Sequence, residues 1–421
     1  MNAEYALTDE SAKISRLRED LESPNPRVRS QAAEDLGKLE ALDAVPDLVD
    51  RLQEDVNTYV RSASAEALGH IGHPAAVFPL MDALRDPCSF VRRAAAISLG
   101  QMQAKEAQGA LLRALEDQNF YVRRAAINAV GKLDLPDFGK VLLPFLDTDD
   151  PRIRRTTIIA LRRLGVREAI PRMIEMLSDY LLAPNQRDLP VVKTLVAALG
   201  EMEADDAVPV LVRVMRGYVG SRSLAAKALG QIDDASAGPA LIEALDVQSR
   251  SLQLAALKSL GQLEYRDALS DVREFLDALD PRLRRTAVLT LGALGDERAI
   301  GSLLEIAKSD DSPLVRPAAV EALGMVGDEE ILDQLLPFVD DSNAYLRAAL
   351  AHALSSLDGD TAEVRSALET LSEDEVRHVS IAAQRALANC GAPPDDVGDD
   401  DSCPEPDKKH LSWLRRFLGR D

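Results

Sequence analysis

The segment NTYVRSASAEALGHI, residues 57–71, decides the fold, because altered copies of it return at a nearly constant interval along the chain. The neighbouring copies are NPRVRSQAAEDLGKL (25–39), CSFVRRAAAISLGQM (88–102) and NFYVRRAAINAVGKL (119–133). A glycine stands at the same place in each copy, with spacings of 32, 31 and 31: Gly37, Gly69, Gly100 and Gly131. A period of this length is typical of stacked helical hairpins, each of which buries its apolar face against its neighbours.

The series continues toward the C-terminus, with one step of 38 residues and the others between 30 and 33. The later positions are Arg162, Gly200, Gly230, Gly261, Gly292, Gly324, Ser355 and Ala388. Each unit carries two stretches with apolar residues at three- and four-residue intervals, as in residues 77–86 and 91–102, so each predicts two helices. The sequence therefore predicts an all-α protein, an α-solenoid (superhelix) of about twelve helical hairpins over residues 1–392.

Local chemistry supports helical stacking. Small residues on the second helix of a unit, such as Ala94, Ala95 and Gly100, should let neighbouring hairpins approach closely, and a large residue there should open the stack. Prolines near the start of the first helix lose no hydrogen bond there: Pro46, Pro79, Pro171 and Pro209. A glycine three positions after the repeat glycine should end the second helix in the left-handed conformation: Gly72, Gly165, Gly295 and Gly327.

Composition agrees with this architecture. Of the 421 residues, 46% are hydrophobic but only 4% are aromatic, which favours close helix packing over a β-sandwich. The first residues lack the basic start and apolar core of a signal peptide, and no stretch of 18 apolar residues occurs, so we expect a cytoplasmic protein. The three cysteines, at unrelated spacings, indicate neither a disulfide framework nor a zinc site.

The net charge of −21 comes from 43 Asp and 27 Glu against 38 Arg and only 11 Lys. Such an Asp-rich, Lys-poor composition resembles that of halophilic proteins, in which strong negative charge maintains solubility. In molar salt the Debye length falls to about 3 Å. Under those conditions we expect partners to be held by contact and shape rather than by long-range steering.

The repeat itself resembles a known family. The pattern of Asp, then Val-Arg six residues later, then Ala-Ala and Leu-Gly, is similar to the HEAT-like repeats of phycobilin lyases, and the resemblance spans residues 10–392. It implies a HEAT-repeat protein of halophilic, archaeal type. Because such repeats also occur in many scaffolds and adaptors, the resemblance identifies a fold more than an activity.

An arginine recurs near the start of the second helix, at Arg29, Arg61, Arg92, Arg123, Arg154, Arg222, Arg284, Arg316 and Arg347. An aspartate often lies six residues earlier, as Asp55, Asp86, Asp117, Asp310 and Asp341. We expect these residues to pair within each repeat as a structural ladder. The aromatic residues two positions before the arginine should close the turn as a hydrophobic staple: Tyr59, Phe90, Tyr121 and Tyr345.

A second arginine follows at Arg93, Arg124, Arg155 and Arg285, without a matching aspartate series. Residues 85–175 hold 16 Lys and Arg against 11 Asp and Glu, inside a strongly acidic chain. This basic segment on the expected concave face is the candidate contact surface for an acidic protein, although a merely solvated face also fits. Its predicted binding residues are Arg92, Arg93, Arg123, Arg124, Arg154 and Arg155. Nucleic acid is not expected, because phosphate binding weakens steeply with salt.

The sixth unit is longer than the others, because SDYLLAPNQRDLP precedes its second helix. Long loops in compact arrays are often functional. The segment either bends the superhelix or forms a docking loop, whose candidate contacts are Tyr180, Leu181, Leu182 and Arg187.

Catalysis has little support in the sequence. His70 and His73 fit a helix end better than a ligand pair, and the chain contains no His-Glu dipeptide of the kind that di-iron HEAT-repeat hydroxylases use. We expect no catalytic residue, no metal and no cofactor. A bilin-lyase-like or other modifying enzyme, or its accessory subunit, remains the alternative; a co-purifying chromophore would reveal the lyase.

The C-terminal segment differs from the repeats. Residues 393–407 are rich in proline and aspartate and predict a disordered acidic linker. Residues 408–421 predict a short basic amphipathic helix, with docking residues Leu411, Trp413, Leu414, Arg415, Arg416, Phe417 and Leu418. Weak contact with a membrane surface, docking to a partner, and folding back onto the solenoid all fit this helix.

The sequence thus favours a cytoplasmic, non-enzymatic protein-binding scaffold or adaptor. Archaeal relatives with such repeats are linked to chemotaxis and motility, so the resemblance implies an adaptor between signalling components.

Overall fold

The structure is a computed structural model that describes residues 2–183, 185–327, 329–357 and 361–390. Throughout those ranges the regular elements are helical and no strand occurs, which confirms the predicted all-α solenoid. The chain divides into two compact units, residues 1–198 and 199–421. The predicted linker (393–407) and terminal helix (408–421) lie outside the described residues. Within the described ranges, no helix is both long enough and apolar enough to cross a bilayer.

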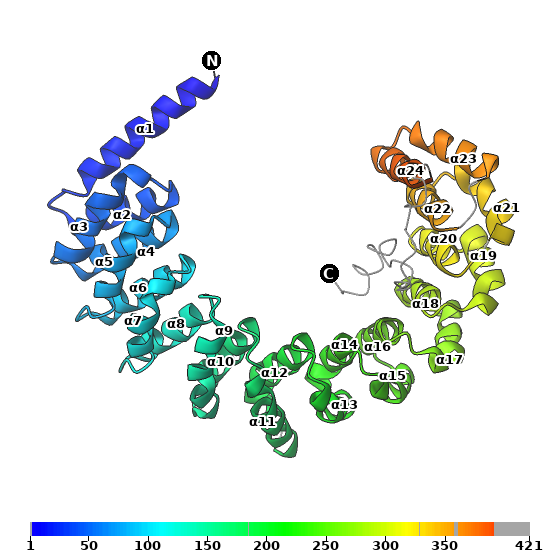
Figure 1. Ribbon diagram of the computed structural model, residues 1–421, viewed down its shortest axis with the longest axis horizontal. Helices are drawn as coiled ribbons and strands as arrows, with labels where there is room; N and C mark the ends of the chain where they lie inside the picture. The colour runs from blue at the N-terminus through cyan, green and yellow to red at the C-terminus, as the bar shows by residue number, and fades with distance from the viewer. Residues whose placement is uncertain (1, 184, 328, 358–360, 391–421) are drawn as a thin grey trace, which may run out of the picture. The chain divides into compact units, whose positions relative to one another are not determined.

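In the first unit, helices alternate between two rows (Figure 1). The row that we call the even row contains α2 (Pro26–Lys38), α4 (Thr58–Ile71), α6 (Ser89–Gln101), α8 (Phe120–Val130), α10 (Pro151–Arg163) and α12 (Leu189–Glu201), the last of which ends in the second unit. The odd row contains α1 (Asn2–Asp20), α3 (Val45–Glu54), α5 (Val77–Ala83), α7 (Gln108–Ala114), α9 (Pro136–Gly139) and α11 (Ile170–Leu182).

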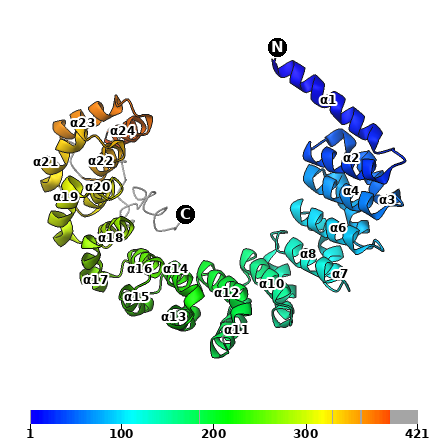
Figure 2. The ribbon, with the colours of Figure 1, turned by 180° about the vertical axis from the view of Figure 1, so that it is seen from behind.

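The second unit repeats this arrangement, as the view from behind also shows (Figure 2). Its even-numbered helices are α14 (Arg222–Ile232), α16 (Arg250–Gln262), α18 (Pro281–Ala293), α20 (Val315–Val326), α22 (Ala344–Ser356) and α24 (Arg377–Cys390). Its odd-numbered helices are α13 (Val208–Gly217), α15 (Gly238–Leu245), α17 (Leu269–Arg273), α19 (Ile300–Ser309), α21 (Leu332–Leu335) and α23 (Ala362–Ser372). The described helices thus form the twelve predicted hairpins.

Most even-numbered helices, such as α4 and α6, pack directly on the next one in the row, and small residues lie at these contacts. A Cβ atom on Gly100 of α6 would lie 2.7 Å from the Cα atom of Ala129 on α8, which is closer than two carbon atoms that are not bonded to each other can approach. The preceding leucine, Leu99, is fully buried. The sequence prediction that glycine permits close stacking is therefore confirmed at this position.

The helix ends follow the expected capping chemistry with one exception. Gly72, Gly165 and Gly295 have φ angles of 69°, 64° and 65° and adopt the predicted left-handed conformation. Gly327 does not, since it ends α20 with an extended backbone (φ −84°, ψ 167°). The prediction of a left-handed residue was therefore wrong at this position.

The arginine ladder exists, but its predicted partners were wrong. Arg61 donates to the carboxylate of Asp86, 25 residues later in the next repeat, at 2.7 and 3.0 Å. Arg61 also contacts Asp55, six positions earlier, but there it donates only to the backbone carbonyl oxygen, at 2.8 Å. The same inter-repeat ion pairs are Arg29–Asp55, Arg92–Asp117, Arg284–Asp310, Arg316–Asp341 and Arg347–Asp374. Each guanidinium therefore clamps two neighbouring hairpins together.

Candidate functional site: a basic groove on the even row

The candidate site is formed by one position that recurs on four successive helices. Arg93, Arg124, Arg155 and Lys193 are each the fifth residue of α6, α8, α10 and α12. Because α6 packs on α8 and α8 on α10, this register places the cations in one row across the helices. We call it the cation row.

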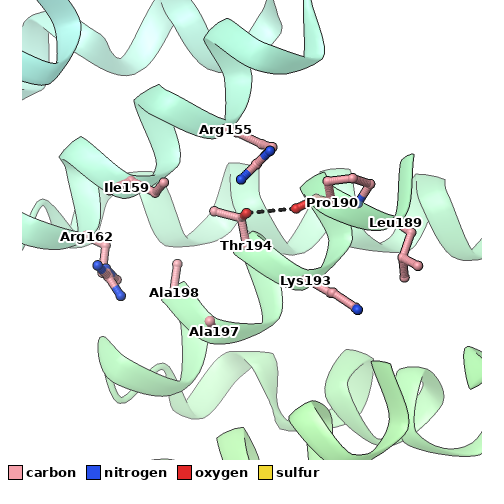
Figure 3. A pocket seen from close by; sticks show the side chains of 9 residues that line it. All are labelled: Arg155, Ile159, Arg162, Leu189, Pro190, Lys193, Thr194, Ala197 and Ala198. Atoms are coloured by element: carbon pink, nitrogen blue, oxygen red, sulfur yellow. Dashed lines mark hydrogen bonds between the residues drawn. The ribbon is translucent and has the colours of Figure 1, made fainter. Parts of the chain in front are cut away.

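Two cavities lie along the cation row. The larger, about 440 Å³, lies between α10 and α12 and is lined by Arg155, Ile159, Arg162, Leu189, Pro190, Lys193, Thr194, Ala197 and Ala198 (Figure 3). The smaller, about 230 Å³, lies between α6, α8 and α10 and is lined by Arg93, Ile97, Tyr121, Arg124, Ala125, Asn128, Thr156 and Ile159. Ile159 lines both cavities, so the two are neighbours, and we call the pair, with the cations that line them, the groove.

A hydrogen bond within α12 orients a side chain that lines the groove. The hydroxyl of Thr194 donates to the backbone carbonyl of Pro190 at 2.8 Å (Figure 3). This bond turns the hydroxyl back toward its own helix. The remaining lining between the cations is mostly aliphatic, so the groove combines an apolar floor with charged borders.

The four cations of the cation row have no carboxylate partner in the part of the chain that the structure describes. Across the described ranges, none of Arg93, Arg124, Arg155 and Lys193 has a carboxylate within ion-pair distance, and the side chain of Arg93 is exposed. The cation of Arg124 instead lies 5.7 Å from the ring centroids of Phe120 and of Tyr121. Unpaired cations around an apolar floor attract carboxylates.

The preceding arginines, which the sequence also assigned to this surface, are engaged elsewhere. Arg92 is paired with Asp117. Arg123 donates to the backbone carbonyls of Asp117 and Gln118, at 2.8 and 3.0 Å. Arg154 donates to the hydroxyl of Tyr180 and to a backbone carbonyl. All three are committed to internal contacts, and none lines the groove.

The predicted aromatic staple is absent at the same helix ends, and that prediction was wrong. The side chains of Tyr59, Phe90 and Tyr121 are 71%, 59% and 51% exposed, so they do not close the turns by burial. Asparagine caps two of these three helices, since the side chains of Asn57 and Asn119 accept the backbone N–H groups of Tyr59 and Tyr121, each at 2.9 Å. The aromatic rings therefore remain exposed at the surface.

The residues of the lengthened sixth unit separate into two groups. Tyr180, Leu181 and Leu182 form the last turn of α11 rather than a loop, and the bond from Arg154 makes Tyr180 part of the stack. Leu182 is 77% exposed. Arg187 lies in a short 3₁₀ turn, residues 186–188, before α12 and is also exposed. Only Leu182 and Arg187 thus have the exposure that docking would require.

Sequence reasoning missed Lys193, because its neighbour Val192 occupies the position of the first arginine and the ladder lapses there. The signal was nevertheless present. Lys193 precedes Gly200 by seven residues, as Arg93 precedes Gly100 and Arg124 precedes Gly131. Arg285 has the same spacing but lies in the second unit, where its charge acts on Glu321.

The described residues hold no cluster of three or more His, Cys, Asp or Glu side chains that could bind a metal ion. The predicted docking residues of the terminal helix, from Leu411 to Leu418, lie outside the described ranges.

Comparison with known protein families finds matches along most of the chain. HEAT repeats match residues 14–98, 45–119, 78–162, 110–189, 238–324 and 302–388, and a PBS lyase HEAT-like repeat matches residues 221–246. Together these matches cover well over half of the chain. No curated protein sequence matches it.

Among solved structures, importin β in an ammonium sulfate condition is similar, with a TM-score of 0.61 and 14% identity over 89% of this chain and 62% of that one. Yeast importin-β (Kap95p) gives a TM-score of 0.58 and 13% identity over 90% and 62% of the two chains. A Kap95:Nup1 complex gives 0.58 and 14% over 89% and 62%. The chain thus spans about three fifths of the length of these structures, and at such identities the likeness shows the fold alone.

Proposed function

Because the chain belongs to the HEAT-repeat proteins, whose stacked hairpins present long surfaces, we propose that it is a non-enzymatic scaffold that holds an acidic segment of a partner protein in the groove of the first unit. The observation that carries this proposal is the contrast between adjacent arginines. Arg92 is neutralised by Asp117, whereas Arg93 and its counterparts on the next three helices have no carboxylate partner among the described residues.

Arginine suits this role chemically. Its planar guanidinium can donate two parallel hydrogen bonds to one carboxylate, which gives geometric specificity. A single exposed ion pair contributes only about 0–1 kcal/mol, so useful affinity requires several pairs together. Four cations in register on α6, α8, α10 and α12 meet that requirement.

A nucleic acid would fit less well, and we propose no such partner. The chain as a whole carries a charge of −21, so a phosphate backbone extending beyond the groove would meet a repulsive surface. A short acidic protein segment confined to the groove avoids that repulsion.

Charge reversal tests the proposal. The triple variant Arg93→Glu, Arg124→Glu, Arg155→Glu should lose co-purifying acidic polypeptides in affinity purification at the native salt concentration, with unchanged helicity by circular dichroism. The matched control reverses three exposed arginines outside the cation row and changes the net charge equally: Arg85→Glu, Arg113→Glu and Arg163→Glu. Undiminished recovery of the partners by the groove variant would refute the proposal.

Three finer points remain part of the proposal. We infer a cytoplasmic location from the composition, and a role between chemotaxis or motility components only from the resemblance of the repeats. Leu182 and Arg187 offer a second contact beside α12. The basic segment 408–421, for which the sequence predicts a helix, offers a third for a partner or a membrane surface. Mass spectrometry of the purified complexes, with and without the residues after Ala392, tests these points.

A further inference from the structure

A row of exposed aromatic rings accompanies the cation row. Tyr59, Phe90 and Tyr121 are each the second residue of α4, α6 and α8. Second and fifth residues of a helix lie one turn apart on the same face. The aromatic row therefore runs parallel to the cation row across α6 and α8, and it continues one helix further at α4.

The two rows meet physically at α8. Tyr121 and Arg124 line the same cavity as Arg93, which comes from the neighbouring helix. Beside them, the cation of Arg152 lies 4.1 Å from the ring centroid of Phe120, and the rings of Phe120 and Tyr121 meet edge to face at 5.1 Å. This cluster holds Tyr121 at the border of the groove while half of its surface stays exposed.

The spacing of the rows restricts the conformation of a segment that crosses them. Packed helices lie about 8–10 Å apart, so successive cations recur at about that interval. A polyproline II segment has three residues per turn and rises about 3.1 Å per residue, so every third side chain returns to the same face after about 9.3 Å. In a β-strand, residues three apart point to opposite faces. An α-helix rises about 1.5 Å per residue and returns a side chain to nearly the same face after seven residues, or about 10.5 Å, so it needs more than twenty residues to reach four cations. A polyproline II segment needs only about twelve.

We propose that the groove binds a partner segment in the polyproline II conformation, with an acidic residue at every third position and proline beside it. This inference rests on the proposed function and specifies its partner. The acidic face of the segment lies on Arg93, Arg124, Arg155 and Lys193. A neighbouring face carries the proline rings against Phe90 and Tyr121, because aromatic surfaces are favourable contacts for proline-rich segments.

The test uses two labelled peptides of equal composition, with about twelve residues to match four turns. In the first peptide, four Asp-Pro-Ala triplets place an aspartate at every third position. In the second, the four aspartates occupy alternate positions and the same prolines and alanines fill the rest. Binding to the full chain is followed by fluorescence anisotropy at one ionic strength. We expect the triplet peptide to bind at least about fivefold more tightly, because only its charges stay in register with the cations.

Substitutions in the aromatic row test its contribution to binding separately from that of the cation row. The double variant Phe90→Ser, Tyr121→Ser should weaken binding of the triplet peptide by about fivefold or more, since it removes the contact for proline. The matched control, Phe78→Ser with Tyr345→Ser, removes two aromatic rings of similar exposure, 67% and 69%, that line neither cavity of the groove. This control should leave the affinity unchanged, and circular dichroism checks that both variants fold.

The outcomes distinguish this inference from the proposed function. If both peptides bind equally well and the Phe90/Tyr121 variant binds normally, the conformational inference is overturned. Charge reversal of the cation row would still abolish binding in that case, so the acidic-partner proposal would stand. If neither peptide binds, the inference also fails, and recovery of native partners by the charge-reversed chain then decides the proposed function independently.

Discussion

At the scale of the residue, two arginines that are adjacent in sequence have opposite environments. Arg92 is a clamp between hairpins, with a side chain 17% exposed and paired to Asp117. Arg93 points to the surface, because one residue rotates the direction of a side chain by about 100° around the helix. A related contrast occurs at Arg123, which donates to two backbone carbonyls, and Arg124, which lines the groove. The position of an arginine on its helix therefore decides whether its charge serves internal contacts or faces the groove.

The ion pair between Arg92 and Asp117 makes the stability of the fold depend on pH. Burial would raise the pKa of Asp117, but hydrogen bonds from Arg92 and from the backbone N–H of Asn119 outweigh it, and the pKa lies below its ordinary value of 3.8. A carboxylate whose folded pKa is lowered stabilises the fold above the unfolded value. That stability is lost as the pH falls through the lower, folded pKa.

We therefore expect Asp117→Asn to reduce the free energy of unfolding by about 2–3 kcal/mol at pH 7. The difference from the parent chain should shrink as the pH falls below the ordinary carboxyl pKa of 3.8, and it should be lost as the pH falls through the lower, folded pKa, where Asp117 of the folded chain becomes neutral. Urea denaturation across this pH range measures it. Asp82→Asn, at an exposed position on α5, is the control, and an equal effect of both substitutions would contradict the clamp.

Glu321 on α20 has a raised pKa in the folded state, whereas that of Asp117 is lowered, so its effect on stability has the opposite pH dependence. Its burial raises its pKa to about 7, against the opposing charge of Arg285. Between pH 4.5 and 7 the folded state binds more protons than the unfolded state, so stability falls as the pH rises through this window.

Glu321→Gln should consequently raise the free energy of unfolding by roughly 1–3 kcal/mol at pH 8 and have little effect below pH 4.5. The control is Glu66→Gln, which occupies the same repeat position on α4 but is exposed. A pH-independent effect of Glu321→Gln would show that the carboxyl group is not responsible.

At the scale of the element, the odd-numbered helices are less regular than the even-numbered ones. α9 (Pro136–Gly139) passes into a 3₁₀ helix, Lys140–Asp147, that contains Pro144. Proline cannot donate the hydrogen bond that an α-helix needs at such a position. The even-numbered helices α6 and α8 each pack on another even-numbered helix at either side, and α6, α8 and α10 are uninterrupted over 11 to 13 residues.

The close approach between α6 and α8 predicts the effect of one methyl group. In Gly100→Ala, the new Cβ atom would meet the backbone of Ala129 and force the helices apart, and we expect a loss of about 1–3 kcal/mol in stability. Gly301→Ala on α19 is the matched control, because no atom lies within 4 Å of its added Cβ atom. The control should be stabilised by up to about 1 kcal/mol, since alanine favours helix over glycine. Similar denaturation midpoints for both variants would contradict the packing argument.

At the scale of the whole molecule, the net charge of −21 opposes folding through self-repulsion. Salt screens this repulsion, because the Debye length shortens from about 10 Å at 0.1 M to about 3 Å at 1 M. Surface ion pairs such as Arg172–Asp147 are also weakened, but each contributes only about 0–1 kcal/mol.

Thermal unfolding should therefore move to higher temperature by a few degrees between 0.1 and 1 M KCl, as measured by circular dichroism. The Arg93/Arg124/Arg155 charge-reversed variant, which is more negative, should gain more from salt than the parent chain. A midpoint that falls with salt would mean that ion pairs outweigh self-repulsion, and it would count against the halophilic prediction.

The sequence by itself determined the repeat length, the two helices of each hairpin, and the glycines that allow α6 to approach α8, because these features depend on local periodicity. Only the tertiary structure decided that Arg61 reaches Asp86 rather than the Asp55 carboxylate, and that Tyr121 stays exposed. These facts depend on how neighbouring hairpins pack on one another, which brings together residues about 25 positions apart. The spacing of residues within a single repeat carries no information about that packing.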